Sequence, residues 1–289
     1  MERPADRTHS PYRSEDGAAS AARSAGPEKY SAGYYLGSCG GSEFFRRYGP
    51  EVLKPQLAHP LRAARLREGM RVLDIGCGRG ELLFQARRSG AAGVGVDFSE
   101  AALGFAREVS GCPVARCDAK ALPFVDGSFD RIFFLGIMDH LLDPELERCF
   151  AEMARVLKPG GRVLLHTCTN TQYYKRWTYP LRRALAKGLG FRVPEPPKSS
   201  EDEELHVNEH SCADIRRFFR RIGWGCSVTP MPNYRYLVER IYRSPLPEGF
   251  PLRPAPGWLA AAYLNFVFLY PLNRLLAREI FAEAWPHEG

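Results

Sequence analysis

The sequence lacks the cysteine patterns that hold zinc or form redox pairs. Its 289 residues include eight cysteines, but none stands in a Cys-x-x-Cys pair or in a Cys/His cluster at zinc spacing. Such spacings mark structural zinc and thiol redox sites, so reduced, isolated thiols are expected here. No basic, apolar, small-residue series of the secretory type opens the sequence, and a cytoplasmic protein is expected.

Long apolar runs and a strong charge of one sign are also missing. The longest apolar run, Trp258 to Leu272, is shorter than the ~20 residues that span a bilayer. The net charge is only +7, and the basic excess lies in residues 171–289. Nucleic acid is therefore disfavoured as a partner, because its binding surfaces carry clustered basic residues. A surplus of this size still allows peripheral contact with an anionic membrane.

Composition divides the chain into segments. Residues 1–29 are rich in Ser, Ala, Arg, Pro and Gly and are expected to form a disordered tail, whereas the aromatic residues of 30–69 predict an N-terminal helical cap. Residues 70–243 alternate short apolar runs with helical periods, which predicts βαβ units. Residues 170–207 interrupt this alternation and are interpreted as a lid insertion. Residues 244–289 are expected to form an apolar C-terminal helical segment.

The predicted fold class is α/β, with a Rossmann-like, doubly wound, seven-stranded and mostly parallel sheet. Asp143-Pro144 and Ser211, with Asp214 three residues later, predict two helix starts, and Gly223 ends the second helix. The expected strands are Arg71–Asp74, Gly93–Asp97, Val114–Cys117, Arg131–Leu135, Arg162–Thr167, Cys226–Thr229 and Tyr236–Ile241.

The most informative run is Val72-Leu-Asp-Ile-Gly-Cys-Gly-Arg-Gly80, a strand that ends in a glycine turn and opens a helix. Glycines let the backbone approach a ligand, and the helix N-terminus presents N–H groups to an anionic group. A dinucleotide site would have a third glycine at position 81, where Glu81 would instead face a pyrophosphate unfavourably. Asp74, just before the turn, favours an ammonium or sulfonium group. The turn therefore indicates a site for a zwitterion.

Two later acids extend this site. Asp97 closes the second strand, where a carboxylate can accept hydrogen bonds from both ribose hydroxyls. Asp118 follows the third strand and can accept a hydrogen bond from an adenine amino group, while Phe98 can lie against the purine.

With these residues the chain resembles the class I S-adenosylmethionine-dependent methyltransferases, in the broad group related to the ubiquinone/menaquinone methyltransferases. Five segments in matching order carry the resemblance: LDIGCGRG (73–80), GVGVDFS (93–99), CDAKALPFVDGSFD (117–130), LGIMDHLLDP (135–144) and EMARVLKPGGRVLLHT (152–167). The resemblance covers residues 70–170 and implies the methyltransferase fold with S-adenosylmethionine as cofactor.

The resemblance also implies which residues surround the parts of the cofactor. The methionine part would be surrounded by Asp74, Gly76, Cys77, Gly78 and Gly80, and the ribose bound by Asp97. The adenine would be read by Asp118 and Ala119, and the cofactor's amino group faced by backbone of Leu135 and Gly136.

The acceptor end departs from some relatives. Relatives that methylate quinone-precursor hydroxyls have acids around the strand-four histidine and bind a divalent metal there. Here Gly136 stands in place of the first acid, and Asp139-His140 alone supplies too few ligands, so no metal is expected. The Asn/Asp-Pro-Pro-aromatic motif of base-amino methyltransferases is missing, which disfavours that reaction.

A general base could come from His206, Glu209 or His210, since histidine titrates near neutral pH and a neighbouring glutamate could hold its tautomer. The alternative is a polar surface loop that caps the next helix. His166 is interpreted as a satisfied sheet histidine, and His140 as a brace for its loop.

Residues 171–192 combine six basic residues with aromatics, and two interpretations stay open for them: a membrane or substrate surface, or a solvated helix face. Trp258–Leu272 is either an interfacial anchor or a core helix. The function expected is methyl transfer to a hydroxyl of a hydrophobic or lipid-linked small molecule. The alternatives are C-methylation of a quinone-like ring, RNA methylation, or a non-catalytic module that binds the cofactor and engages a partner.

Overall fold

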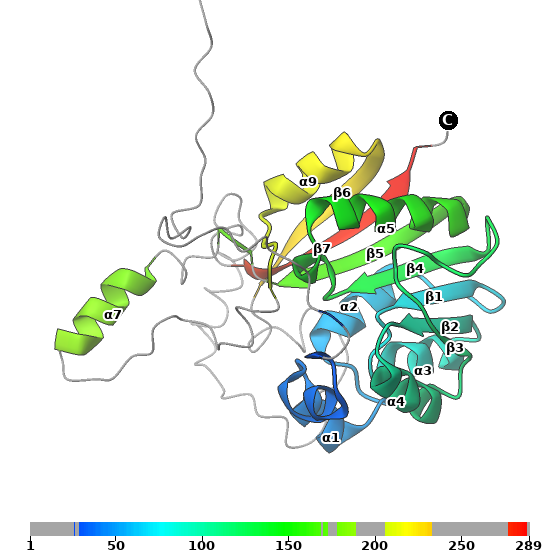
Figure 1. Ribbon diagram of the computed structural model, residues 1–289, viewed down its shortest axis with the longest axis horizontal. Coiled ribbons are helices and arrows are strands. Elements are labelled where there is room, and N and C mark those ends of the chain that lie inside the picture. Colours follow the sequence, from blue (N-terminus) through cyan, green and yellow to red (C-terminus); the bar gives the residue numbers. More distant parts are fainter. Residues whose placement is uncertain are drawn as a thin grey trace, which may run out of the picture.

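A computed structural model describes residues 26, 29–168, 170–172, 178–188, 206–232 and 277–287. Seven strands form one sheet in the order β3-β2-β1-β4-β5-β7-β6 (Figure 1). The strand β7 is antiparallel to both of its neighbours, and the other pairs are parallel. The strands are β1 (Arg71–Ile75), β2 (Ala92–Asp97), β3 (Val114–Arg116), β4 (Phe129–Leu135), β5 (Leu157–Cys168), β6 (Trp224–Pro232) and β7 (Ala277–Pro286). The predicted mostly parallel α/β sheet is confirmed.

Helices cover both faces of the sheet. Figure 1 shows α5 and α9 on one face and α2, α3 and α4 on the other. The helical elements are η2 (Tyr34–Ser38), α1 (Ser42–Tyr48), α2 (Pro55–Ala63), α3 (Glu81–Arg88), α4 (Glu100–Ser110), η3 (Met138–His140), α5 (Asp143–Val156), α7 (Tyr179–Gly188) and α9 (Cys212–Arg221).

The main core lies between the sheet and the α5/α9 face. Leu146, Phe150 and Met153 recur at helical spacing on α5 and are fully buried. The Phe150 ring packs edge-on against Phe134 of β4 and Phe219 of α9. Burying each such side chain contributes about 1.5–3 kcal/mol. The helical spacing of these apolar residues in the sequence places them all on the side of α5 that packs against the sheet.

The seventh strand is not where the sequence analysis expects it. The expected strand near Tyr236–Ile241 lies outside the described residues, and β7 occupies the place in the sheet between β5 and β6. The expectation of helix through the end of the chain is wrong for residues 277–286. Most residues of β7 are buried, but Arg278, Glu279 and Glu283 interrupt its apolar residues, so the segment shows no strict alternation that would mark it as a strand in the sequence.

The helix starts follow the sequence signals closely. Ser211 accepts a hydrogen bond from the backbone N–H of Asp214, and the Asp214 carboxylate accepts one from the N–H of Ser211, as a capping box requires. The start of α5 is displaced by one residue, since Asp143 is the first helical residue and Leu142 precedes it as N-cap. The Glu145 carboxylate accepts the hydrogen bond from the Leu142 N–H.

Of the predicted lid (residues 170–207), the structure describes residues 170–172, residues 178–188, which include the helix α7, and residues 206–207. Figure 1 shows α7 standing apart from the sheet. The predicted N-terminal tail up to residue 25 and the apolar run Trp258–Leu272 lie outside the described residues.

Among the residues described, there is no helix with the length and apolar character needed to cross a membrane.

Candidate active site

The glycine turn after β1 brings three chain segments together at the carboxyl edge of the sheet. The N–H groups of Gly76 and Cys77 both donate to the Val96 carbonyl of β2, at 2.7 and 3.1 Å. Gly76 has a φ of +68°, and a Cβ atom there would lie 2.5 Å from Ile137 Cδ1 in the loop after β4. Glycine is favoured at this position, because the positive φ is strained for any residue with a side chain and a Cβ atom would also displace the end of the Ile137 side chain.

The Asp97 carboxylate stands at the end of β2 and closes this turn. Its Oδ2 accepts from the Gly78 N–H at 3.1 Å and its Oδ1 accepts from the Ser99 N–H at 2.9 Å. Burial raises the pKa of Asp97, although the hydrogen bonds from Ser99 and Gly78 oppose the rise. The pKa of Asp74 lies well above its usual range, because this side chain is buried and close to the carboxylates of Asp97 and Glu81. The turn is thus a buried region of negative potential.

Tyrosines of the N-terminal segment cover the turn. The Tyr30 ring lies 4.9 Å from the Phe98 ring, and its carbonyl accepts from Ser99 Oγ at 2.6 Å. Tyr35 is buried and donates a hydrogen bond that lowers the pKa of Asp97. Arg79, in the turn itself, donates to the Tyr35 carbonyl at 2.9 Å and pairs with Glu81 at 3.2 Å. The sequence alone does not predict a role for these tyrosines in the site. Their clustering shortly before the first strand is the feature of the sequence that could have indicated one.

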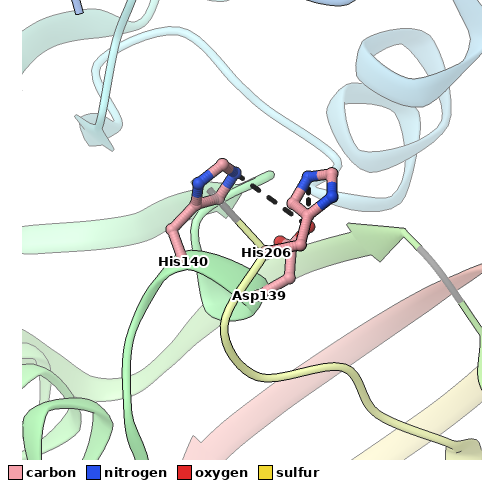
Figure 2. A group of neighbouring side chains, drawn as sticks. All are labelled: Asp139, His140 and His206. Atoms are coloured by element: carbon pink, nitrogen blue, oxygen red, sulfur yellow. Dashed lines mark ion pairs between the residues drawn. The ribbon is translucent and has the colours of Figure 1, made fainter. Parts of the chain in front are cut away.

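A second polar group lies beside the turn, where β4 ends. Figure 2 shows Asp139 and His140 from η3 with His206 from the segment before α9. His206 Nε2 lies 3.2 Å from Asp139 Oδ2, and His140 Nε2 lies 4.0 Å from the same oxygen. The two imidazole rings are 4.9 Å apart between centroids. We call Asp139, His140 and His206 the acceptor cluster.

The acceptor cluster is fixed by hydrogen bonds from three sides. Thr167 Oγ1 of β5 donates to Asp139 Oδ1 at 3.2 Å. The Asn208 N–H donates to the Asp139 carbonyl at 3.1 Å, and its side-chain amide donates to the Leu141 carbonyl at 3.0 Å. The Tyr30 hydroxyl lies 3.1 Å from His140 Nδ1. Tyr30 therefore connects the cofactor turn, through Phe98, with the acceptor cluster.

The three predicted base candidates are separated by the structure. His206 enters the acceptor cluster, and its carboxylate partner there is Asp139. Glu209 is half-buried in the same segment. His210 is buried with neither ring nitrogen hydrogen-bonded, and burial lowers its pKa, so it is held neutral behind the cluster. No spacing in the sequence relates Asp139 to His206, because the fold alone brings the loop after β4 against the segment before α9.

The two other histidines considered from the sequence have distinct surroundings. His166 is buried and its Nε2 lies 3.2 Å from Glu279 Oε2 of β7, so the prediction of a satisfied sheet histidine is confirmed. His140 does brace its loop through Tyr30, and it also belongs to the acceptor cluster.

Residues 72–161 match the family of methyltransferase domains. The chain carries a class I methyltransferase domain. It is 40% identical over 176 residues to a ubiquinone/menaquinone biosynthesis C-methyltransferase of Bordetella avium, which covers 53% of this chain and 64% of that protein. It is also 36% identical over 127 residues to a probable tRNA methyltransferase 9B of Mus musculus, covering 42% of this chain and 28% of the relative. The chain thus spans less than two thirds of each of these relatives.

A solved structure shares the fold of this methyltransferase domain. Phosphoethanolamine N-methyltransferase 2 of Haemonchus contortus, in complex with S-adenosyl-L-methionine, superposes with a TM-score of 0.56 at 20% identity, covering 89% of this chain and 60% of that one. The resemblance inferred from the five sequence segments is confirmed.

S-adenosylmethionine is the cofactor of the methyltransferase domain, and the turn suits it. Asp74 has its pKa raised by burial and by two neighbouring carboxylates, so a cation placed there would relieve their repulsion, and the cofactor carries both an ammonium and a sulfonium. Asp97 is buried at the position where a ribose diol would bind. Gly76 has no side chain, and its α-carbon lies close to Ile137 in the loop after β4. These residues fit the group.

The remaining predicted cofactor residues lie along the same edge of the methyltransferase domain. Asp118 is exposed and paired with Lys120 at 3.1 Å, and Ala119 beside it is half-buried. The Gly136 N–H donates to the His166 carbonyl at 2.8 Å, and the contact of Leu135 and Gly136 with the amino group of the cofactor stays a prediction. The role of Asp118 in binding the adenine stays a prediction.

Proposed function

We propose that this chain is an enzyme that transfers the methyl group of S-adenosylmethionine to a hydroxyl of a hydrophobic small molecule. The observation that carries the proposal is the acceptor cluster, joined to the cofactor turn by Tyr30. The Tyr30 ring lies 4.9 Å from Phe98 on the cofactor side, and its hydroxyl lies 3.1 Å from His140 Nδ1 on the acceptor side. A molecule bound over the cluster would have its reacting atom near the turn.

The chemistry of the cluster favours an oxygen acceptor. The cofactor supplies an electrophilic methyl group on sulfur. When a hydroxyl attacks, the O–CH₃ bond forms, the S–CH₃ bond breaks with its electron pair kept by sulfur, and the hydroxyl proton passes to solvent, directly or through a side chain of the cluster. A carboxylate and two imidazoles can accept a hydrogen bond from a hydroxyl and aim its oxygen at the methyl group. The products are a methyl ether and S-adenosylhomocysteine.

C-methylation of a phenolic ring is the second candidate, and it is favoured by the similarity to a quinone C-methyltransferase. Such a ring also reacts after its hydroxyl is aimed and loses its proton, so the same cluster would serve. The two reactions differ only in the atom that lies in line with the methyl group. RNA methylation is supported by similarity to probable tRNA methyltransferases, of which this chain matches 28% and 21%, and by no feature of the acceptor cluster.

The test is an incubation with cofactor carrying a ¹³C-labelled methyl group and fractionated cell extract. We expect label in the organic-solvent fraction, at a carbon shift typical of a methyl ether. Substitution His206→Gln should lower turnover about 100-fold or more and leave cofactor affinity unchanged, whereas the exposed His287→Gln is a matched control without effect. Label on a ring carbon would support the second candidate. Label in RNA, or none with the cofactor bound, would refute the proposal.

We also propose that the protein meets a membrane surface through α7, where a hydrophobic acceptor would be taken up. Leu181 and Leu185 stand one turn apart on this helix and are 65% and 60% exposed. The sequence from 171 to 192 has six basic residues and no acid, which suits an anionic surface.

A further inference from the structure

We propose that the acceptor cluster binds a divalent first-row transition-metal ion, with Zn²⁺ as the representative ion. The inference deepens the proposed function and rests on it for the role of the ion, although the site itself is argued from its own geometry. The ion would be held by one carboxylate oxygen of Asp139 and one ring nitrogen each of His140 and His206.

The three side chains already lie close to a ligating arrangement. Their ligand atoms all lie within 4.8 Å of one another, with separations of 3.2 Å from Asp139 Oδ2 to His206 Nε2 and 4.0 Å to His140 Nε2. Metal–ligand bonds of about 2.0–2.2 Å place neighbouring ligand atoms roughly 3–3.5 Å apart. In Figure 2 the two imidazoles approach the Asp139 carboxylate from separate elements. A shift of about 1 Å by the imidazole rings would bring the three ligand atoms to the separations of a bound ion.

Hydrogen bonds from outside the cluster orient its side chains. Thr167 Oγ1 donates to Asp139 Oδ1, and Oδ2, which also has the Cys168 thiol at 3.8 Å, is the oxygen that both imidazoles approach. The Tyr30 hydroxyl meets His140 at Nδ1, so Nε2 is the nitrogen that faces Asp139. Metal-binding histidines commonly donate their other N–H to such an oxygen, which fixes the tautomer. Hydrogen bonds that orient two of the three proposed ligands, Asp139 and His140, are therefore present.

The charge of the cluster also calls for a cation. Asp139 is 1% exposed, and within the described part of the chain its ion-pair partners are the two imidazoles of the cluster. Burying a carboxylate is costly unless a positive charge pairs with it. An imidazole supplies that charge only when it is protonated, whereas a bound divalent ion supplies it while both imidazoles act as neutral ligands.

The donor set selects the class of ion. Two imidazole nitrogens and one carboxylate oxygen suit Zn²⁺, Fe²⁺, Co²⁺ or Ni²⁺, whereas Mg²⁺ and Ca²⁺ prefer oxygen ligands alone. Three protein ligands leave at least one coordination position for the oxygen of an acceptor. An ion there would lower the pKa of a bound hydroxyl, so that its proton leaves to solvent and its oxygen attacks the methyl group.

This inference reverses the expectation drawn from the sequence. That expectation counted Asp139 and His140 as too few ligands, and the structure adds His206 as a third. The ligand count on which it rested was therefore wrong, because the third ligand comes from a segment far along the chain.

The experiment measures metal binding directly, with untagged full-length protein stripped of metal and then titrated with Zn²⁺ by calorimetry and with Co²⁺ by visible absorption. We expect one ion per chain and Co²⁺ absorption bands from nitrogen and oxygen ligands. His206→Gln should weaken Zn²⁺ binding at least tenfold and change the Co²⁺ spectrum. The exposed His287→Gln should change neither, and it controls for adventitious binding to surface histidines.

Asp139→Asn is a second variant with the same expectation, and circular dichroism checks that each variant is folded. The proposal is overturned if stripped wild-type protein takes up no stoichiometric ion, or if folded His206→Gln binds Zn²⁺ as tightly as wild type. S-adenosylmethionine affinity and methyl transfer are measured on the same stripped samples. Full transfer by stripped protein would overturn the role of the ion in the reaction and keep the proposed function, whereas stoichiometric metal binding without any transfer would keep the metal site and overturn the proposed function.

Discussion

At the scale of single residues, Asp97 ties the cofactor turn to the end of β2. It is buried, and its two oxygens accept hydrogen bonds from the backbone of Gly78 and Ser99. Asp97→Ala should lower S-adenosylmethionine affinity at least tenfold, because hydrogen bonds to a charged group contribute roughly 1.5–3 kcal/mol each. Calorimetry on folded protein is the measurement. Unchanged affinity would show that the ribose binds elsewhere, and NADH serves as a control ligand that should not bind.

His59 is a residue whose titration should make the protein sensitive to acid. Its ring packs edge-on against Phe281 at 4.6 Å, and its pKa is lowered from 6.5 to about 4 by burial, with smaller effects of Arg62 and His166. Folded protein therefore keeps His59 neutral below pH 6.5, while the unfolded chain takes up a proton. The contribution to stability is complete above pH 6.5 and is lost as the pH falls toward 4.

We expect protonation of His59 in the unfolded chain to lower the free energy of unfolding by about 1 kcal/mol between pH 7 and pH 5, after allowing for solvent screening of a half-buried ring. His59→Phe keeps the ring contact and removes the titration, so it should lose less stability over this range. Urea unfolding at both pH values measures the difference. Equal losses for His59→Phe and wild type would exclude His59 as the source, and His287→Phe is the exposed control.

The cofactor residues could be predicted from the sequence, whereas the acceptor cluster could not. Asp74, the glycine turn and Asp97 lie within 30 residues of one another, and local strand-turn-helix chemistry fixes their arrangement. Asp139 and His206 are joined only by the way α9 packs on the sheet and by Asn208, which holds its segment against η3. Nothing in the local sequence encodes that contact.

At the scale of elements, the strands with helical neighbours were predicted and β7 was not. The strands β1, β2 and β4 are separated by amphipathic helices or clear turns, which marks their ends. The strand β7 carries the charged residues Arg278, Glu279 and Glu283 among its apolar residues, and this pattern is also compatible with a helix in the sequence. In the sheet Glu279 is buried, and although burial opposes its ionisation, the hydrogen bond with His166 holds its pKa below the usual range.

The helix α7 carries the prediction of membrane contact. Leu181→Glu with Leu185→Glu should reduce co-sedimentation with anionic vesicles at least fivefold, because both side chains are exposed on this helix. High salt should also reduce it, since each basic residue near an anionic surface contributes about 1 kcal/mol. Val125→Glu, at a side chain that is 78% exposed elsewhere, is the matched control. Wild-type protein that stays in the supernatant throughout would exclude the contact.

At the scale of the whole molecule, the sheet depends on the last strand of the chain. The strand β6 pairs with β7, and β7 in turn pairs with β5, so β7 connects α9 and β6 to the cofactor half. A chain ending at residue 276 should lose cooperative unfolding, because the hydrogen bonds on both sides of β7 and its apolar burial are comparable with a total stability of ~5–15 kcal/mol. Near-ultraviolet circular dichroism and urea titration measure this.

A chain ending at residue 286 keeps β7 and is the control for that truncation. It should unfold at the same urea concentration as the full chain. A folded, cooperative protein that ends at residue 276 would show that β7 contributes little, and would contradict the strand order on which the argument depends.

The position of β7 in the chain also bears on how the protein is made. The strand β5 ends at Cys168 and its partner β7 is complete only at Pro286, about 120 residues later. At a synthesis rate of ~5–20 residues per second, the edge of β5 would wait roughly 6–24 s for its neighbour. During that interval the cofactor half has a bare strand edge that can pair with another nascent chain. Yield in cells should therefore respond to translation speed and to chaperone supply more than the stability of the finished protein would suggest.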